Sequence, residues 1–245
     1  MPQPSIPEPS VPAEIRSALL SDDWFRSCPP RLQDALIVHA RGRRLQAGEY
    51  LFTRGMADAD LYCVLAGSLC VQSVDLEGEG EIPVLVVLQP YHWLGELSLI
   101  DGTPRSHDAL AETDVTVLRV PRAALESWLA ANPEQWRDIA RLAAGKLRIA
   151  YRVMDVEMRR PLTERVARRL WLVAHGWGSR SSQPRHRIHL SQDQLARMLG
   201  TTRSGVNKAL RELERQGTMR LHYGEIELLD LVALRRGAVS AEPAS

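Results

Sequence analysis

The sequence has few cysteines, with only Cys28, Cys63 and Cys70 among its 245 residues. No two of them form a Cys-x-x-Cys pair, and none has a metal-type spacing with a histidine. Iron–sulfur and zinc sites need clusters of thiolate ligands. We therefore predict no metal or iron–sulfur cluster and expect the three cysteines to be small buried side chains.

Long hydrophobic runs and the common catalytic motifs are also absent from the sequence. No apolar run approaches the roughly 18 residues that span a bilayer, and the N-terminus lacks the basic-then-apolar pattern of a signal peptide. No Gly-x-Ser-x-Gly, His-Glu-x-x-His or Walker motif is present. These observations predict a cytoplasmic protein with no membrane partner, no enzymatic activity and no catalytic residues.

Charge is balanced over the whole chain but not along it. The formal net charge is only +1, yet residues 161–236 contain 14 Lys and Arg against 7 Asp and Glu, a balance of +7. The rest of the chain carries 17 basic and 23 acidic residues, a balance of −6. A basic C-terminal region favours a polyanionic partner.

Composition divides the chain into segments. Five of the fifteen prolines lie in residues 1–12, which predicts a disordered tail, and the small polar residues 237–245 predict a second, flexible tail. Between residues 41 and 121, short β-type runs alternate with glycines, which is typical of a sandwich or barrel. Helical segments are expected at 13–20, 30–40 and 122–130, so we assign residues 13–132 to one domain.

Residues 133–158 lose the strand pattern and acquire a heptad spacing. The apolar positions recur at intervals of 4, 3, 4, 3 and 4 and are Trp136, Ala140, Ala143, Leu147, Ala150 and Met154. Such a seam favours parallel pairing of two chains, and the alternative is a single helix packed on the sandwich. Because Pro161 ends the pattern, we place a dimerisation helix and hinge at 133–160 and a second domain at 161–236.

The second domain carries a helix-turn-helix pattern. Ser191 and Gln194 form a capping box that opens one short helix, Gly200 ends it, and Thr202 can cap the next helix. A hairpin-like segment at 219–228 follows and predicts a wing. In this geometry the start of the second helix enters the DNA major groove, and an ordinary helical hairpin is the alternative. The candidate DNA-binding residues are Ser191, Gln192, Thr202, Arg203, Ser204, Asn207, Lys208 and His222.

A third motif lies in the first domain, at residues 93–107. A Gly-Glu turn precedes an Arg-Ser pair, with a short apolar segment between them. These residue types suit a sugar phosphate: Arg105 can pair with the anion, Ser106 can donate to it, and Glu96 can accept from a ribose hydroxyl.

The order of these motifs over residues 13–236 resembles the cyclic-AMP receptor/FNR family of bacterial transcription regulators. The resemblance implies an α+β fold: an N-terminal cyclic-nucleotide-binding β jelly roll, a long dimerisation helix and a C-terminal winged helix-turn-helix domain. It also implies that Arg203, Ser204 and Lys208 read bases. The implied ligand-binding residues are Gly95, Glu96, Leu97, Arg105 and Ser106, joined by Ala150 and Tyr151 from the dimer helix.

The function expected from this resemblance is a homodimeric, sequence-specific DNA-binding transcription regulator. Its DNA partner is a near-palindromic double-stranded operator. A nucleotide, with cyclic AMP as the first candidate, controls its affinity for DNA. The loop at 176–187 is expected to contact RNA polymerase. A cyclic-nucleotide-binding regulatory module that does not bind DNA is the competing class. That class does not explain why residues 161–236 carry a charge balance of +7.

Three positions depart from the cyclic-AMP receptor pattern. His107 stands where a small residue follows the Arg-Ser pair, Ala150 and Tyr151 stand where two hydroxyl residues contact adenine, and Ser204 replaces a glutamate. Tyr151 lies between Arg148 and Arg152, a surface on which guanine can stack. Two alternatives to cyclic AMP therefore remain: control by cyclic di-GMP, and no small ligand at all.

Overall fold

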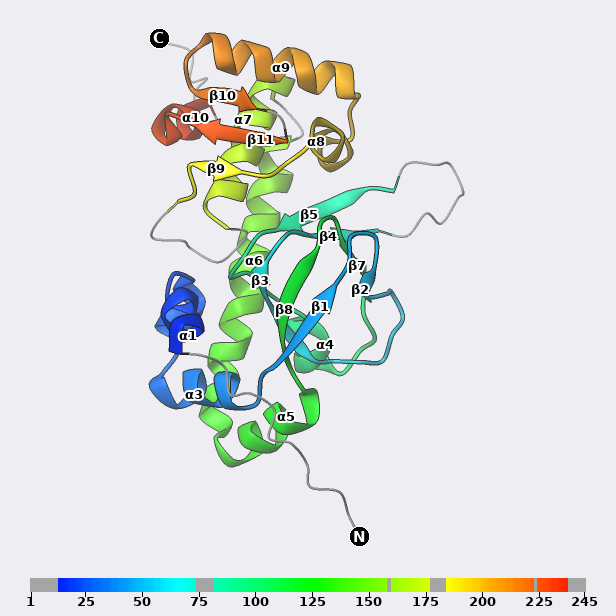
Figure 1. The fold of residues 1–245 in the computed structure, drawn as a ribbon, viewed down its shortest axis with the longest axis vertical. Coiled ribbons are helices and arrows are strands. Elements are labelled where there is room, and N and C mark those ends of the chain that lie inside the picture. Colours follow the sequence, from blue (N-terminus) through cyan, green and yellow to red (C-terminus); the bar gives the residue numbers. More distant parts are fainter. Residues whose placement is uncertain (1–12, 74–81, 158–159, 177–183, 223, 238–245) are drawn as a thin grey trace.

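The computed structural model describes residues 13–73, 82–157, 160–176, 184–222 and 224–237. The predicted tail 1–12 and all of the predicted tail 237–245 except Gly237, which is the last residue of a helix, lie outside the described residues. Figure 1 shows a sandwich of β-strands, a long helix beside it and a C-terminal domain at one end. Three short helices precede the sandwich: α1 (Ala13–Leu19), α2 (Asp23–Ser27) and α3 (Pro30–Val38). Within the described ranges, no helix combines the length and apolar character of a membrane span.

The sandwich consists of two four-stranded sheets with antiparallel pairing. One has the order β1-β8-β3-β6 and the other β2-β7-β4-β5. The expected jelly roll is therefore confirmed. The strands are β1 (Arg41–Leu45), β2 (Tyr50–Phe52), β3 (Leu61–Ala66), β4 (Leu69–Gln72), β5 (Val84–Leu88), β6 (Trp93–Leu94), β7 (Asp108–Ala111) and β8 (Val115–Val120).

The three cysteines lie in the interior of the protein. All are free and buried, and burial raises the pKa of the Cys28 and Cys70 thiols to about 12. Burial also raises the pKa of Cys63. The reactive thiolate form is therefore suppressed at neutral pH, and the expectation of small buried side chains is confirmed.

Helix α6 (Trp136–Glu157) runs along the sandwich after α5 (Arg122–Ala131) and the short 3₁₀ turn η1 (Pro133–Gln135) (Figure 1). Ile139 and Leu142 are fully or almost fully buried. Ala140 is exposed, and Leu147 is 51% exposed. The helix thus packs on its own sandwich with one face and leaves much of the predicted heptad face uncovered within a single chain.

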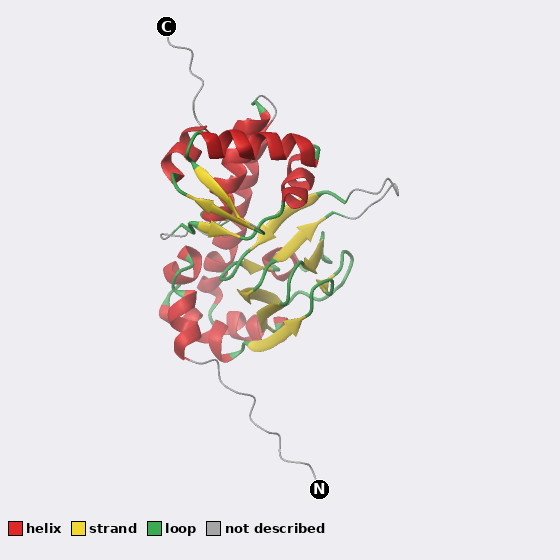
Figure 2. Cartoon of the chain, turned by 45° about the horizontal axis from the view of Figure 1, so that its top comes forward, coloured by secondary structure: helices red, strands yellow, loops and turns green. Residues whose placement is uncertain are grey.

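The C-terminal domain is a winged helix-turn-helix, as expected. A single hydrophobic cluster that includes Leu170, Leu195, Val206 and Leu210 holds its helices together. Its three-stranded sheet has the order β10-β11-β9, and Figure 2 shows strands lying beside the helices of this domain. The elements are α7 (Leu162–Ala174), β9 (Arg187–Ile188), α8 (Gln192–Leu199), α9 (Arg203–Arg215), β10 (Met219–His222), β11 (Glu225–Leu228) and α10 (Leu231–Gly237).

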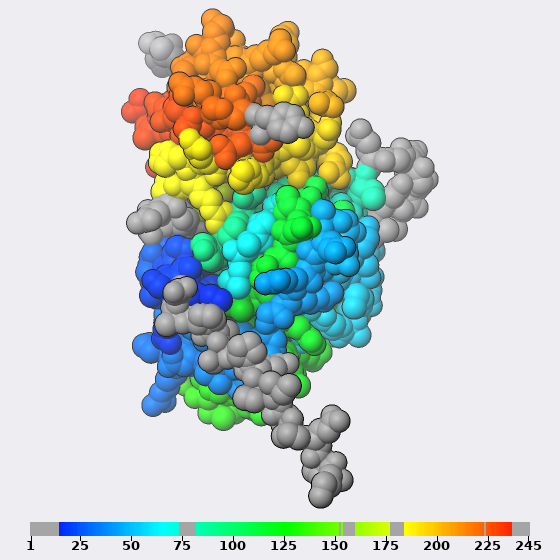
Figure 3. All heavy atoms as spheres, in the orientation of Figure 1, coloured from blue at the N-terminus to red at the C-terminus, as the bar shows by residue number. Residues whose placement is uncertain are grey.

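The C-terminal domain packs directly on the sandwich, as the space-filling view shows (Figure 3). Buried Cys70, Val84 and Val87 from the sandwich belong to the same hydrophobic cluster as the core of the C-terminal domain. At the edge of this contact, Gln89 Nε2 donates a hydrogen bond of 3.2 Å to the His189 carbonyl. The C-terminal domain therefore packs on the second sheet of the sandwich.

His92 makes the stability of the folded protein depend on pH. Its ring is fully buried, Nδ1 lies 2.7 Å from the Gln89 carbonyl oxygen, and burial lowers its pKa from 6.5 to about 3. The unfolded chain binds this proton below pH 6.5 and the folded chain does not, so acid favours unfolding over that window. Stability from His92 is fully present above pH 6.5 and is lost as the pH falls towards 3.

We predict that His92→Gln removes this part of the acid sensitivity. Between about pH 7.5 and pH 5.5, the wild-type free energy of unfolding should fall by about 1.4 kcal/mol more than that of the variant. Urea unfolding at both pH values measures the difference, and His39→Gln at the partly exposed end of α3 is the control. Equal losses in wild type and His92→Gln would contradict the assignment.

Candidate ligand pocket and nucleic-acid interface

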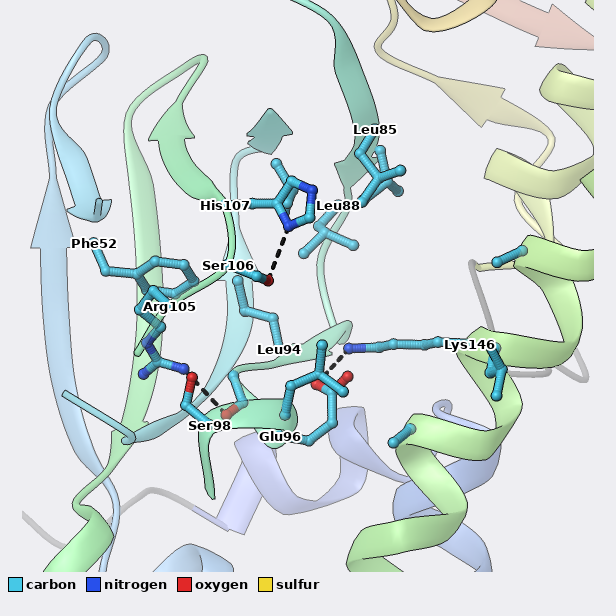
Figure 4. A pocket seen from close by; sticks show the side chains of 17 residues that line it. Phe52, Leu85, Leu88, Leu94, Glu96, Ser98, Arg105, Ser106, His107 and Lys146 are labelled. Carbon is cyan, nitrogen blue, oxygen red and sulfur yellow. Dashed lines mark hydrogen bonds and ion pairs between the residues drawn. The ribbon is translucent and has the colours of Figure 1, made fainter. Parts of the chain in front are cut away.

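A cavity of about 320 Å³ lies between the sandwich, α4 (Glu96–Asp101) and α6 (Figure 4). Ten of its seventeen lining residues are hydrophobic, so the wall is mainly apolar. The lining residues are Phe52, Val71, Leu85, Val86, Leu88, Leu94, Gly95, Glu96, Leu97, Ser98, Arg105, Ser106, His107, Ala143, Lys146, Leu147 and Ala150.

The backbone at Gly95 allows the predicted motif at residues 93–107, which we call the cassette, to form. Gly95 has φ 99° and immediately precedes α4. A Cβ atom there would lie 2.5 Å from the Asp60 carbonyl oxygen and 2.8 Å from Arg105 Nη1. Only glycine tolerates both this φ and this close approach. Gly95 and Arg105 therefore lie in direct contact.

Arg105 is committed to partners within the protein. Its side chain is only 3% exposed, and Nη2 donates to Asp58 Oδ1 at 2.5 Å and to the Asp60 carbonyl at 2.7 Å. Nη1 donates to the Gly95 carbonyl at 3.1 Å, and the guanidinium carbon lies 4.3 Å from the Phe52 ring centroid. The guanidinium lies beside Phe52 in Figure 4. The arginine expected to hold an anion therefore already holds a carboxylate.

Asp58 remains ionised in this pair. Burial raises the pKa of its carboxyl, but the hydrogen bond from the Asp60 N–H and the Arg105 charge outweigh burial and leave the pKa below its ordinary value. Tyr62 also donates to Asp58, with an Oη···Oδ2 distance of 2.9 Å. Asp58 is a functional candidate that the sequence analysis missed, because it lies 47 residues from Arg105 and outside the cassette.

Glu96 is paired as well. Lys146 extends from α6 and places Nζ 2.6 Å from Glu96 Oε2 and 2.8 Å from the Trp93 carbonyl oxygen (Figure 4). The Glu96 side chain is 4% exposed and that of Lys146 is 26% exposed. The pair therefore joins the cassette to α6, which is a contact that the sequence analysis did not predict.

The other predicted ligand residues divide into two groups. Ser106 Oγ lies 2.9 Å from His107 Nδ1, and both residues line the cavity with Leu97 and Ala150. Tyr151 is 57% exposed and is not among the lining residues. The arginine surface considered for guanine stacking includes Arg152, whose side chain lies outside the described part of the structure.

These residues do not fit a cyclic phosphodiester as they stand. Such a ligand needs an arginine free to pair with its phosphate and a carboxylate free to accept from its ribose. Arg105 is paired with Asp58, and Glu96 is paired with Lys146. Arg105 Nε has no partner within the described residues, but it is buried, so a molecule in the cavity does not reach it.

The second candidate site is the exposed start of α9. Arg203, Ser204, Asn207, Lys208 and Arg211 line one open surface depression. Arg203 is 69% exposed, with its Nε 3.6 Å from Asp193 Oδ1. The structure thus brings together four of the residues expected to contact DNA, on the face that a recognition helix presents to the major groove.

Local capping fixes the orientation of this helix. Thr202 Oγ1 accepts from the Gly205 N–H at 3.2 Å, and the capping box of Ser191 and Gln194 is present at the start of α8. Gly200 ends α8 with φ 57°, as expected. Asn207 Nδ2 donates to Gln192 Oε1 at 3.1 Å, which ties the two helices together. Ser191 and Gln192 therefore lie at the exposed or half-exposed start of α8, beside the recognition helix.

The predicted wing is the hairpin of β10 and β11. His222 Nε2 lies 3.1 Å from Glu227 Oε2, and Arg220 Nη1 lies 3.7 Å from the same oxygen. The side chain of His222 is 43% exposed. His222 therefore stands at the surface of the wing and is not among the residues that line the depression on α9.

A jelly-roll sensor domain joined through a long helix to a winged helix-turn-helix defines a DNA-binding regulator with a ligand-sensing domain. Profile comparison agrees: "Cyclic nucleotide-binding domain" matches residues 42–132, and "Crp-like helix-turn-helix domain" matches residues 164–237. The chain belongs to the CRP/FNR family of transcription regulators.

Relatives of this chain are transcription regulators too. The chain is 31% identical to the transcriptional regulator SdrP of Thermus thermophilus, over 73% of this chain and 84% of that protein. It is 27% identical to the CRP-like cAMP-activated global transcriptional regulator of Mycobacterium tuberculosis, over 87% of this chain and 95% of that protein. A crystal structure of a CRP/FNR-family regulator from Thermus thermophilus is 28% identical, with a TM-score of 0.60, covering 82% of this chain and 99% of that one.

Proposed function

We propose that this protein is a homodimeric, sequence-specific DNA-binding transcription regulator whose affinity for its operator is controlled by a small molecule in the sensor pocket. The observation that carries the proposal is the open face of α9. Arg203, Ser204, Asn207 and Lys208 converge there on a helix held by caps at its start. Arginine and lysine donate hydrogen bonds to guanine. Serine and asparagine can form hydrogen bonds with base edges in the groove or with phosphate oxygens.

Dimerisation is supported by the uncovered face of α6. Ala140, Leu147 and Tyr151 are exposed on this helix, and Leu97 and Ile100 of α4 are 52% and 41% exposed. α4 and α6 contact one another, so these apolar side chains belong to neighbouring elements. Pairing two α6 helices would bring two recognition helices into one complex, and a near-palindromic operator requires them about one DNA turn apart.

We predict that Leu147→Glu separates the dimer into monomers. The substitution places two carboxylates in an apolar helix seam, which should weaken dimerisation about a hundredfold or more. Analytical ultracentrifugation at micromolar concentration should show the mass of two chains for wild type and of one chain for the variant. Val38→Glu is the control, because Val38 is 69% exposed on α3. A monomeric wild type, or an unchanged dimer in Leu147→Glu, would contradict the proposal.

Observations for and against cyclic AMP as the ligand are both present. The domain profile supports a cyclic nucleotide. A Mycobacterium tuberculosis relative named as cAMP-activated supports cyclic AMP, which the sequence also favours. The pairing of Arg105 with Asp58 and of Glu96 with Lys146 does not support it. We therefore propose control by a small molecule in this pocket and retain cyclic AMP and cyclic di-GMP as compounds to test.

Two further parts of the proposal concern the setting of the regulator. We propose that it acts in the cytoplasm and that the DNA-bound dimer contacts RNA polymerase. The sequence places that contact in residues 176–187, of which 177–183 lie outside the described part of the chain.

A further inference from the structure

The charged side chains that line the cavity are paired within the protein. Arg105 is matched by Asp58, and Lys146 is matched by Glu96. His107 is uncharged at neutral pH, because burial and the nearby charge of Arg54 lower its pKa. The pocket therefore presents no unpaired cation from its lining to a bound molecule.

The remaining wall is suited to an apolar molecule. Leu85, Leu88 and Leu94 come from strands of the sandwich (Figure 4). Val86 comes from the same side, and Leu147 comes from α6. A charged group placed among such side chains without a partner loses its hydration and gains nothing in return. The hydroxyl of Ser106 and the ring of His107 are polar but uncharged, so they can satisfy one hydrogen-bonding group of a ligand.

We propose that this pocket takes a small, uncharged and mainly apolar molecule with one hydrogen-bonding group, and that Asp58 excludes phosphodiester anions by neutralising Arg105. Asp58 acts as a positioning residue, through Arg105. A cavity of about 320 Å³ has room for a molecule of two or three rings or a chain of similar volume. Only the consequence of binding, a change in DNA affinity, rests on the proposed function. Binding of the molecule in the pocket does not.

Two fluorescent probes with the same ring skeleton test the choice between neutral and anionic ligands. N-phenyl-1-naphthylamine is neutral, and 8-anilino-1-naphthalenesulfonate carries one negative charge. Titration of the full chain should show saturable binding of the neutral probe, one per chain, and about tenfold or more weaker binding of the anionic probe. Cyclic AMP at about 1 mM should not raise the thermal unfolding midpoint of wild type.

Asp58→Asn should shift this preference towards anions. The asparagine keeps the shape of Asp58 but leaves Arg105 with its charge unbalanced, so the affinity ratio of the two probes should move by about tenfold towards the sulfonate. Cyclic AMP should then raise the unfolding midpoint. Asp101→Asn is the matched control, because Asp101 is an exposed carboxylate at the end of α4.

A double variant that removes both charges keeps the proposal testable if Asp58→Asn alone does not fold. The double variant Asp58→Asn/Arg105→Gln removes both charges at once and should bind the neutral probe as wild type does. A site that used Arg105 to hold an anion would instead lose its ligand in this variant. Circular dichroism confirms that each variant has folded.

Cavity substitutions locate the bound probe. Val86→Trp fills the cavity and Leu85→Asp puts a charge at its exposed side, so each should abolish binding of the neutral probe. Val38→Trp, on the exposed surface of α3, should leave it unchanged.

Three results would overturn the inference. They are equal binding of the two probes by wild type, a rise in the wild-type midpoint with cyclic AMP, and an unchanged probe ratio in Asp58→Asn. All of these measurements are made without DNA. Failure of the proposed function would instead appear as an absence of operator binding by wild type, so the two failures are distinguishable.

Discussion

Arg203→Ala should weaken binding to the specific operator by about 1 to 3 kcal/mol per half-site and relax the base preference at the position that Arg203 contacts. Arg203 is the first residue of α9 and is 69% exposed. Its ion-pair partner, Asp193, is itself 61% exposed, so DNA can replace this weak pair at little cost. Arginine donates two hydrogen bonds to guanine, and alanine donates none.

Arg215→Ala is the matched control for this prediction. Arg215 lies at the other end of α9, is 75% exposed and pairs with Glu212. Its loss changes the net charge by the same amount but removes no contact at the start of the helix. Fluorescence anisotropy with the operator and with single-base variants measures both effects. If Arg203→Ala and Arg215→Ala weakened binding to all sequences equally, Arg203 would not read bases.

Lys146→Met should destabilise the sensor domain by about 3 kcal/mol. The substitution leaves the Glu96 carboxylate, 4% exposed, without the ammonium group that lies 2.6 Å away. A buried carboxylate without a partner costs far more than an exposed ion pair contributes. Because Lys146 lies on α6 and Glu96 lies at the start of the cassette, the same pair connects pocket and helix.

A double-mutant cycle separates the pair from other effects of Lys146. Glu96→Gln/Lys146→Met removes both charges, so it should recover a large part of the stability that Lys146→Met loses. Urea unfolding of wild type, both single variants and the double variant gives the coupling energy. Arg141→Met on the same helix, whose side chain is 53% exposed, is the control and should cost less than about 1 kcal/mol. Additive losses in the cycle would show that the two charges do not interact.

The helix-turn-helix was predictable from sequence because its signals are local. The capping box of Ser191 and Gln194 and the left-handed glycine at 200 each act over a few residues, and both are present as expected. The alternation of apolar runs and glycines likewise predicted most strands of the jelly roll. Strands β1, β6 and β7 were not among the predicted runs. In β1, four of the five residues are exposed and three of them are arginines, so it carries no apolar alternation.

The pocket was only partly predictable because its charge pairs join distant residues. The sequence indicated that Glu96 and Arg105 belong together, and Arg105 does donate to the Gly95 carbonyl. It gave no sign that Asp58 and Lys146 pair with them, since sequence separations of 47 and 50 residues carry no periodic pattern. The heptad spacing predicted a seam for pairing two chains. It gave no sign of the burial of Ile139 and Leu142, which depends on a hydrophobic cluster with the N-terminal helices and the sandwich.

Selection of bound duplexes from a random DNA pool tests the central claim, that two chains read a symmetric site through α9. The proposal predicts an enriched near-palindromic sequence with half-sites about 10 base pairs apart, bound by two chains per duplex. It also predicts that enrichment is lost at the same base position in both half-sites for Arg203→Ala. An unenriched pool, or an asymmetric site bound by one chain, would contradict the claim.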